Sequence, residues 1–286
     1  MKYFFTVTNL KKDKDKSFTK EVKKYIEQKG GHCTCYYSSG SKDEAERIDL
    51  KQIPGQTECI LVLGGDGTLI RTARDLYELN LPMIGINLGT LGYLCELERD
   101  RVKGALDEMM VGNYMLESRM MLEGHCVVDG EPQRIRTAFN DVIIHRGANP
   151  SVSNLILRVN GEYLHTYTGD GIVVATPTGS TAYNMSAGGP IVDPKAELLL
   201  VTPINSHSLN SKSIVLSAED EIEIEVGTRN NETHESAEVS FDGDSPVQVH
   251  VGDKILIKKA EHSTNILKLN QRSFLEILGK KMQMYI

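Results

Sequence analysis

The sequence predicts an α/β N-terminal Rossmann-like domain and an all-β, largely antiparallel C-terminal domain, with a C-terminal helix returning to the first domain. Three observations predict this fold class. In the first 117 residues, apolar runs of strand length alternate with stretches of helical spacing, as in a parallel sheet covered by helices. From about Met120 the hydrophobic period changes from 3.6 to 2, and turn dipeptides recur. A helical apolar pattern returns near the C-terminus.

Composition narrows the class of protein. The 286 residues allow one large domain or two ordinary ones, and the formal net charge of -7 argues against a nucleic-acid partner. No apolar run approaches the roughly 20 residues that span a bilayer, and the opening segment has no signal-peptide pattern. The five cysteines are scattered, odd in number and without zinc-site spacing. We therefore expect a cytoplasmic protein with reduced thiols and no membrane partner.

The first elements follow from local patterns. Residues 2–9 are predicted to form a strand, and Ser17 is predicted to cap a helix that ends at a pair of glycines. The apolar positions of this helix share one face: Phe18, Val22, Tyr25 and Ile26. A second strand is expected near residues 32–37, and a polar connection follows over residues 38–56.

The central stretch is residues 60–70, in which a branched apolar run meets three glycines around one aspartate and then a helical pattern. Such a strand, tight turn and helix N-terminus present free N–H groups and a helix dipole, which favour phosphate. The glycines let a bulky anion approach the backbone. Because a carboxylate is electrostatically unfavourable in an anion site, we expect Asp66 to have a functional role.

The next strand is predicted at residues 82–87. The turn after it, residues 87–92, and the central turn both lie at carboxyl ends of predicted parallel strands, where ligands bind in such sheets. A helix with one apolar face closes this half, through Val102, Ala105, Leu106 and Met109.

The second half alternates apolar and polar residues. Residues 155–159 alternate before an Asn-Gly turn, and residues 222–226 alternate again. Residues 239–241 precede an Asp-Gly turn, and residues 247–251 follow it. This is the pattern of antiparallel hairpins. The final helix is predicted from Phe274, Leu275, Leu278 and Met282.

Two further segments carry polar groups suited to a ligand. Residues 168–190 place a dense hydroxyl and glycine segment after a short strand, which suits a ribose or a base edge. Tyr183 in this segment is suited to stack on an aromatic ring. A loop that only joins β elements is the alternative. Asn140 and Asp141 precede another apolar run, either as a turn or as ligands of a diol.

The stretch Gly64–Thr68 resembles a signature shared by NAD kinases, diacylglycerol and sphingosine kinases and, more remotely, phosphofructokinases. Its companions distinguish among these families, because in order and separation they resemble motifs of bacterial NAD kinases. The companions are residues 87–94, 118–122, 140–147, 170–189, 203–209 and 241–243. On these motifs the chain resembles the NAD kinase family from about residue 60 to about residue 245.

The resemblance implies ATP-dependent phosphorylation of the 2′-hydroxyl of the adenosine ribose of NAD, producing NADP. It implies an α/β domain over residues 1–117, with residues 270–286 packing back on it, and a nucleotide-binding β domain over residues 118–269. Mg²⁺ or another divalent cation would arrive with ATP, and no metal-ligand set is expected in the chain itself. Family members are typically homo-oligomers, here a dimer or tetramer, and some accept polyphosphate.

Carried over by motif, Asp66 would be the catalytic base; metal ligation is its rival role. Phosphate would be bound by Gly64, Gly65, Gly67, Thr68 and Arg71. NAD would be bound by Gly67, Asn140, Asp141, Asp170, Thr178, Thr181, Ala182, Tyr183 and Ser186. The family motif has glutamate where this chain has Asp141, so the carboxylate here is one methylene shorter.

Three other functions fit parts of the pattern. A lipid kinase with the same glycine turn would need an apolar trench, whereas residues 176–183 are small and polar. A non-catalytic NAD(P)-binding sensor would be expected to lack the aspartate at position 66. A purely structural role as a β-rich oligomer would not explain the two glycine-dense polar loops.

Overall fold

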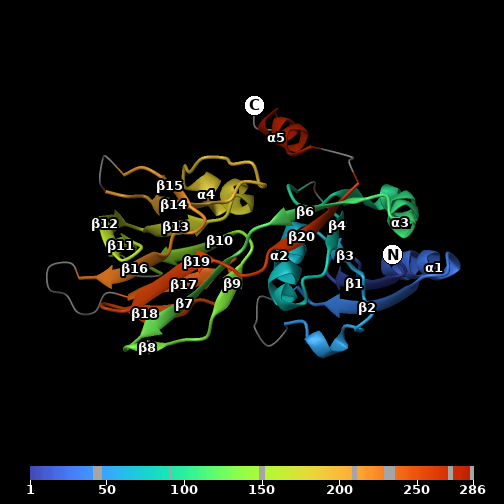
Figure 1. Ribbon diagram of the computed structural model, residues 1–286, viewed down its shortest axis with the longest axis horizontal. Coiled ribbons are helices and arrows are strands. Elements are labelled where there is room, and N and C mark those ends of the chain that lie inside the picture. Colours follow the sequence, from blue (N-terminus) through green and yellow to red (C-terminus); the bar gives the residue numbers. More distant parts are fainter. Residues whose placement is uncertain are drawn as a thin grey trace. The chain divides into compact units, whose positions relative to one another are not determined.

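The computed structural model describes residues 1–40, 47–89, 92–147, 152–207, 211–228, 236–269 and 273–283. The chain divides into two compact units (Figure 1): the first comprises Met1–Arg119 and Ser263–Ile286, and the second comprises Met120–His262. Among the described residues, no helix is long and apolar enough to cross a membrane.

The first unit is built on a mostly parallel sheet. Its strands are β1 (Tyr3–Asn9), β2 (His32–Ser38), β3 (Cys59–Gly64), β4 (Met83–Asn87), β5 (Leu97–Glu98), β6 (Met115–Arg119) and β20 (Thr264–Lys268). The strand order is β2-β1-β3-β4-β20-β6, with β5 also paired to β4. All pairs are parallel except β20 with β6. A strand from the far end of the chain thus completes the N-terminal sheet.

The first unit also contains helices. They are α1 (Ser17–Gln28), α2 (Asp66–Asp75), α3 (Val102–Val111) and α5 (Phe274–Gln283), with short 3-10 turns η2 (Leu50–Gln52), η3 (Tyr77–Leu79) and η4 (Arg99–Arg101). The buried faces of α1 and α3 join one apolar cluster with the strands. All four apolar positions predicted for the helix after residue 100 are buried in α3. The α/β class predicted for this half is confirmed.

The prediction that Ser17 caps α1 is wrong, because Ser17 is the first helical residue and the cap is supplied by Asp13. The Asp13 carboxylate accepts hydrogen bonds from the backbone N of Phe18 at 3.3 Å and of Thr19 at 2.9 Å. Lys16 adopts a left-handed φ of 60°, which turns the chain before the helix. The carboxylate is a stronger acceptor than a serine hydroxyl for these free N–H groups.

Two helical patterns differ from expectation in detail. The pattern after residue 66 splits, since α2 ends at Asp75 and η3 follows it. The predicted final helix is present as α5, although two of the residues that predict it, Leu275 and Met282, are 73% and 58% exposed, and Ile277 is buried. Within the polar connection at 38–56, residues 50–52 form η2, and residues 41–46 lie outside the described residues.

The second unit is a sandwich of two antiparallel sheets. Its strands are β7 (Leu122–Val128), β8 (Glu131–Pro132), β9 (Arg136–Ala138), β10 (Asp141–His145), β11 (Ser153–Val159), β12 (Glu162–Gly169), β13 (Gly171–Ala175), β14 (Leu198–Ile204), β15 (Ile214–Ser217), β16 (Ile222–Gly227), β17 (Ser236–Phe241), β18 (Val247–His250) and β19 (Lys254–Lys259). One sheet has the order β15-β14-β13-β10-β17-β18, and the other β12-β11-β16-β19-β7-β8, with β9 on β7. This confirms the predicted antiparallel β half.

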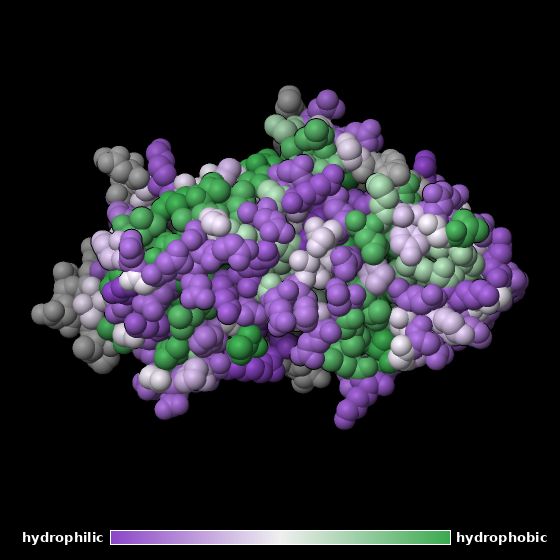
Figure 2. Space-filling view, in the orientation of Figure 1, coloured by the Kyte–Doolittle hydropathy of each residue, from purple (hydrophilic) through white to green (hydrophobic). Residues whose placement is uncertain are grey.

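Alternate residues of both sheets form one core, which includes Leu155, Leu157, Ile222, Ile224 and Val226 at the predicted positions. The turn between β11 and β12 has positive φ at both Asn160 (53°) and Gly161 (81°), as a two-residue hairpin requires. Asp242 and Gly243 behave alike after β17, with φ of 52° and 67°. Hydrophilic and hydrophobic side chains are interspersed on the face shown in Figure 2.

Candidate active site

Asp66 is the first residue of α2, directly after the β3 strand and the extended Gly65. The predicted strand, turn and helix are therefore confirmed. The Asp66 carboxylate accepts three backbone hydrogen bonds, from Tyr93 N at 2.6 Å and from Leu94 N and Cys95 N at 3.2 Å each. These donors and the helix N-terminus offset the electrostatic penalty of placing a carboxylate at this turn.

Two glycines are required around Asp66 by close approach. A Cβ on Gly92 would lie 2.0–2.2 Å from the Asp66 carboxylate atoms, and one on Gly64 would lie 2.4 Å from Thr68 Oγ1. Thr68 Oγ1 also accepts a hydrogen bond from Asn9 Nδ2 at 3.1 Å. The glycines at these two positions therefore keep the carboxylate and the threonine in place.

A cavity of about 240 Å³ opens beside Asp66. It is lined by Lys12, Gly64, Gly65, Asp66, Asn87, Gly89, Gly92 and Lys281. Of the predicted phosphate-binding residues, Gly64 and Gly65 line it, whereas Gly67, Thr68 and Arg71 do not. Lys12 and Lys281 were missed by sequence reasoning, because a surface lysine has no local signal that separates ligand binding from solvation. Residues 90 and 91 of the adjoining motif lie outside the described residues.

In the second unit, Asn140 and Asp141 are positioned by Asp242. The Asp242 carboxylate accepts hydrogen bonds from the backbone N of Phe139 and Asn140, both at 2.7 Å, and of Asp141 at 3.1 Å. Asn140 Oδ1 is buried and has no hydrogen-bond partner. Since buried polar atoms are nearly always paired, this oxygen is ready to accept a hydrogen bond from a ligand.

Asp141 is only 4% exposed. Its burial, together with the negative charge of Asp242, raises the pKa of the Asp141 carboxyl to about 8, although a backbone N–H of Tyr183 acts in the opposite direction. Burial disfavours the charged form because a carboxylate loses its hydration. At pH 7 the Asp141 carboxyl is therefore mainly neutral, and it can donate a hydrogen bond as well as accept one.

This raised pKa predicts a pH dependence of stability. The folded chain holds the Asp141 proton up to about pH 8, whereas the unfolded chain releases it near pH 4. Between these values a rise in pH destabilises the folded state through Asp141. In Asp141→Asn this loss is absent, so the Tm of the variant minus that of wild type should increase from pH 5 to pH 8 in thermal melts. A difference that stays constant with pH would show that Asp141 is ionised throughout.

The segment after β13 is tied to Asn140 by its backbone. It contains η5 (Thr178–Thr181) and α4 (Tyr183–Ser186). Thr176 N donates to Asn140 O at 2.8 Å, and a Cβ on Gly179 would lie 2.1 Å from that same oxygen. Glycine at 179 is thus needed for this close approach. The structure brings the predicted residues of this segment together with Asn140 and Asp141 within the second unit.

Within this segment the predicted side chains differ in exposure. Thr178 is buried, Thr181 and Ala182 are half-buried, and Tyr183 and Ser186 are exposed. The fully buried Asn184, which the sequence analysis did not select, fixes the segment: its Nδ2 donates to Ser180 O at 3.2 Å and to Pro190 O at 3.0 Å. An anchor of this kind leaves the neighbouring Tyr183 ring free to meet a ligand.

Asp170 lies at the junction of β12 and β13 and is also anchored. Asn205 Nδ2 donates to one carboxylate oxygen at 2.8 Å, and Arg146 Nε donates to the other at 2.7 Å. Both side chains lower the pKa of Asp170, so it stays ionised. Arg146 and Asn205 fall inside segments quoted for the family resemblance; residues 208 and 209 of the second lie outside the described residues.

Two family models match most of the chain: the ATP-NAD kinase N-terminal domain over residues 5–114 and the ATP-NAD kinase C-terminal domain over residues 139–269. The chain belongs to the ATP-NAD kinase family. The NAD kinase of Agathobacter rectalis is 51% identical over 285 residues, covering 100% of both chains. The NAD kinase of Lachnospira eligens is 42% identical, covering 99% of this chain and 100% of that one.

Solved structures of this family share the fold. An NAD kinase from Archaeoglobus fulgidus in complex with ATP superposes with a TM-score of 0.75 at 25% identity, covering 98% of each chain. Yeast NADH kinase complexed with NADH superposes with a TM-score of 0.83 at 24% identity, covering 99% of this chain and 88% of that one. The second likeness establishes the fold alone.

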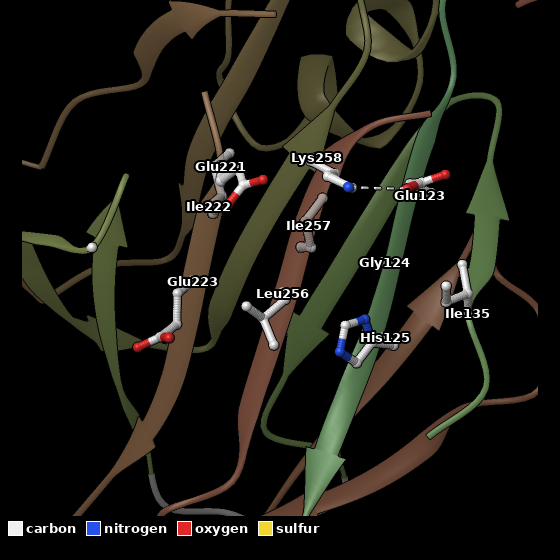
Figure 3. A pocket seen from close by; sticks show the side chains of 11 residues that line it. Glu123, Gly124, His125, Ile135, Glu221, Ile222, Glu223, Leu256, Ile257 and Lys258 are labelled. Atoms are coloured by element: carbon white, nitrogen blue, oxygen red, sulfur yellow. Dashed lines mark ion pairs between the residues drawn. The ribbon is translucent and has the colours of Figure 1, made fainter. Parts of the chain in front are cut away.

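A second cavity of about 430 Å³ lies on the sheet formed by β7, β16 and β19 in this family member (Figure 3). Lys258 Nζ and Glu123 Oε1 form an ion pair at 3.5 Å at its edge, and the His125 and Leu256 side chains lie beside each other. It is lined by Glu123, Gly124, His125, Ile135, Gly161, Glu221, Ile222, Glu223, Leu256, Ile257 and Lys258. None of the predicted site residues is among them.

Proposed function

We propose that this member of the ATP-NAD kinase family transfers the terminal phosphate of ATP to the 2′-hydroxyl of the adenosine ribose of NAD, producing NADP and ADP. The observation that carries this proposal is the anchored Asp66 carboxylate beside a cavity at a strand-to-helix turn. Full-length similarity to NAD kinases supports the same reaction.

In this reaction the ribose oxygen bonds to the terminal phosphorus while the bond to the bridging oxygen of ADP breaks. We propose that Asp66 orients the hydroxyl and takes its proton as the new bond forms. Its three N–H donors support this role, because they fix the carboxylate without blocking every acceptor position. The turn around Gly65 and Gly67 would present backbone N–H groups to phosphate oxygens. We also propose that Thr68 and Arg71 bind phosphate.

The lining of the cavity beside Asp66 suits a divalent cation that is bound together with phosphate groups. Among the described residues that line the cavity, Asp66 is the one with an acidic side chain. A single carboxylate combined with phosphate oxygens and water suits Mg²⁺, which seldom relies on an all-protein cage. We therefore propose that Mg²⁺, or another divalent cation, arrives with ATP and supplies positive charge to its phosphates.

NAD binding is proposed for the residues selected in the second unit. The unpaired buried oxygen of Asn140 would accept a hydrogen bond from the adenosine part, and the neutral Asp141 carboxyl would donate one. Asp170 would contact the nicotinamide end. The neighbouring segment would line the dinucleotide pocket through Thr178, Thr181, Ala182, Tyr183 and Ser186.

Tyr183 gives the first test of this placement. Tyr183 is 43% exposed, so a base or nicotinamide ring can stack on its side chain. Tyr183→Ala is expected to weaken NAD binding about tenfold, because stacking on an aromatic ring contributes roughly 1–3 kcal/mol. ATP binding should change less than twofold. Calorimetry with each nucleotide measures both constants.

Tyr183→Phe is the matched control for this prediction, since it keeps the ring and removes only the hydroxyl. It should bind NAD nearly as wild type does. Equal losses of affinity for NAD and for ATP in Tyr183→Ala would show that the Tyr183 ring supports packing and does not stack on NAD.

We further propose a cytoplasmic homo-oligomer, a dimer or tetramer. Large apolar side chains exposed on the second unit support self-association, among them Ile135 at 60% and Tyr163 at 62%. Light scattering on the purified chain tests this, since a monomer at micromolar concentration would contradict it.

A coupled assay tests the reaction. The purified chain is incubated with NAD, ATP and Mg²⁺, and NADP is followed with an NADP-specific dehydrogenase. Parallel reactions with polyphosphate in place of ATP, and with NADH in place of NAD, define the donor and acceptor. Binding of NAD without NADP from any combination would indicate a sensor. The same assay distinguishes an NAD kinase from a lipid kinase, because a lipid kinase would not form NADP.

A further inference from the structure

The cavity beside Asp66 contains two ammonium groups that the motifs do not account for. Lys12 comes from the turn after β1, and its Nζ lies 2.9 Å from the position that a Cβ on Gly89 would occupy. Lys281 comes from α5, near the other end of the chain. Among the described residues, neither lysine forms an ion pair with an acidic side chain. Their charges are therefore available to a ligand.

Lys281 contacts an aromatic ring at the cavity. Its Nζ lies 4.8 Å from the centroid of the Tyr93 ring. The backbone N of Tyr93 donates the 2.6 Å hydrogen bond to Asp66. Lys281 thus contacts the same segment that fixes the catalytic carboxylate. A cation–π contact at a partly exposed site is weak, so the ammonium can leave the ring for a phosphate oxygen.

The charges around the cavity indicate an anionic ligand. Among its lining residues, Asp66 contributes one negative charge, and Lys12 and Lys281 contribute two positive charges, giving a net charge of +1. Without Lys281 the net charge would be zero. The cavity volume of about 240 Å³ leaves room for a phosphate group.

We propose that Lys281 of the C-terminal helix binds a phosphate group of the donor, together with Lys12, and so makes α5 part of the donor site. Lys281 lies beyond residue 269, where the match to the C-terminal family model ends. The inference rests on the proposed kinase function for the identity of the donor. The competing explanation is that Lys280 and Lys281 only stabilise the C-terminal end of α5, since both occupy its last turn.

The test compares Lys281→Ala with Lys280→Ala in the full chain. Lys280 is exposed, lies in the same helical turn and is not among the cavity-lining residues. Its replacement therefore changes the net charge of the protein, and the charge at the C-terminal end of α5, by the same amount as replacement of Lys281 does. Lys281→Ala is expected to raise the KM for ATP about tenfold, the size of one lost charge-assisted hydrogen bond. The KM for NAD should stay within twofold. Lys280→Ala should leave both constants within twofold, and Lys281→Arg should restore most of the ATP affinity.

Binding of inorganic tripolyphosphate, measured by calorimetry, separates this inference from the kinase proposal. It should be weakened in Lys281→Ala and unchanged in Lys280→Ala, whether or not NADP is formed. Absence of NADP from wild type would overturn the kinase function alone. Equal tripolyphosphate affinity and equal ATP KM in the two variants would overturn the role of Lys281.

Discussion

Replacing Asp66 by Asn is expected to lower kcat by about 10²–10⁴-fold, the range typical of removing a general base. The amide cannot take the proton of the ribose hydroxyl. Its NH₂ group also cannot accept the hydrogen bonds that the Asp66 carboxylate receives from Tyr93, Leu94 and Cys95. Steady-state kinetics with saturating NAD and ATP measures the effect.

The fold and NAD binding serve as controls for Asp66→Asn. Because all the residues proposed to hold NAD except Gly67 belong to the second unit, the Kd for NAD should stay within about threefold of wild type. Circular dichroism should show an unchanged far-UV spectrum. A kcat near that of wild type would remove Asp66 from the chemistry, whatever its position at the turn.

Replacing Gly92 by Ala is expected to lower kcat/KM by about a hundredfold or more. The added Cβ would lie 2.0–2.2 Å from the Asp66 carboxylate, so either the carboxylate or the backbone that holds it must move. A displacement of about 1 Å at a reacting group is sufficient for a loss of this size. The measurement is kcat/KM for ATP and for NAD on the same preparation.

Gly104→Ala is the matched control, because a Cβ there meets no atom within 4 Å and Gly104 lies inside α3. It should retain activity and stabilise the protein by about 0.5–1 kcal/mol, since alanine favours a helix over glycine. If Gly92→Ala were as active as Gly104→Ala, then the position of the Asp66 carboxylate would not limit the reaction.

The elements that the sequence predicts well are those whose causes are local. A branched apolar run followed by glycines specifies β3 and the turn before Asp66. The apolar spacing of α3 matches its buried face, and Asn160 with Gly161 meets the positive φ values of a two-residue hairpin. In each case the residues that decide the conformation lie within a few positions of one another.

The features that sequence reasoning missed depend on distant residues. β20 enters the N-terminal sheet by pairing Ile266 with Met83, and nothing in either local pattern specifies that partner. Asp242 holds the backbone before β10 from about 100 positions away. The exposure of Leu275 likewise depends on tertiary packing. Helical spacing of apolar residues indicates a helix but does not show which of them pack against the rest of the protein.

The candidate site divides in the same way. The glycine-rich turn is a local signal, so the place of Asp66 at a helix N-terminus was predictable. The three N–H donors on its carboxylate come from residues 93–95. The motif at residues 87–94 includes the first two of these residues but gives no sign that their N–H groups bind Asp66. The lysines of the cavity come from opposite ends of the chain and carry no motif. Their presence beside Asp66 is visible only in the folded protein.

The most direct test of the proposed reaction uses ATP with a radioactive terminal phosphate. The purified chain is incubated with this ATP, NAD and Mg²⁺, and the nucleotides are separated. The account predicts that label appears in a product that an NADP-specific dehydrogenase reduces, and that Asp66→Asn forms almost none of it. Label found only in ATP or inorganic phosphate, with NAD unchanged, would contradict phosphoryl transfer to NAD.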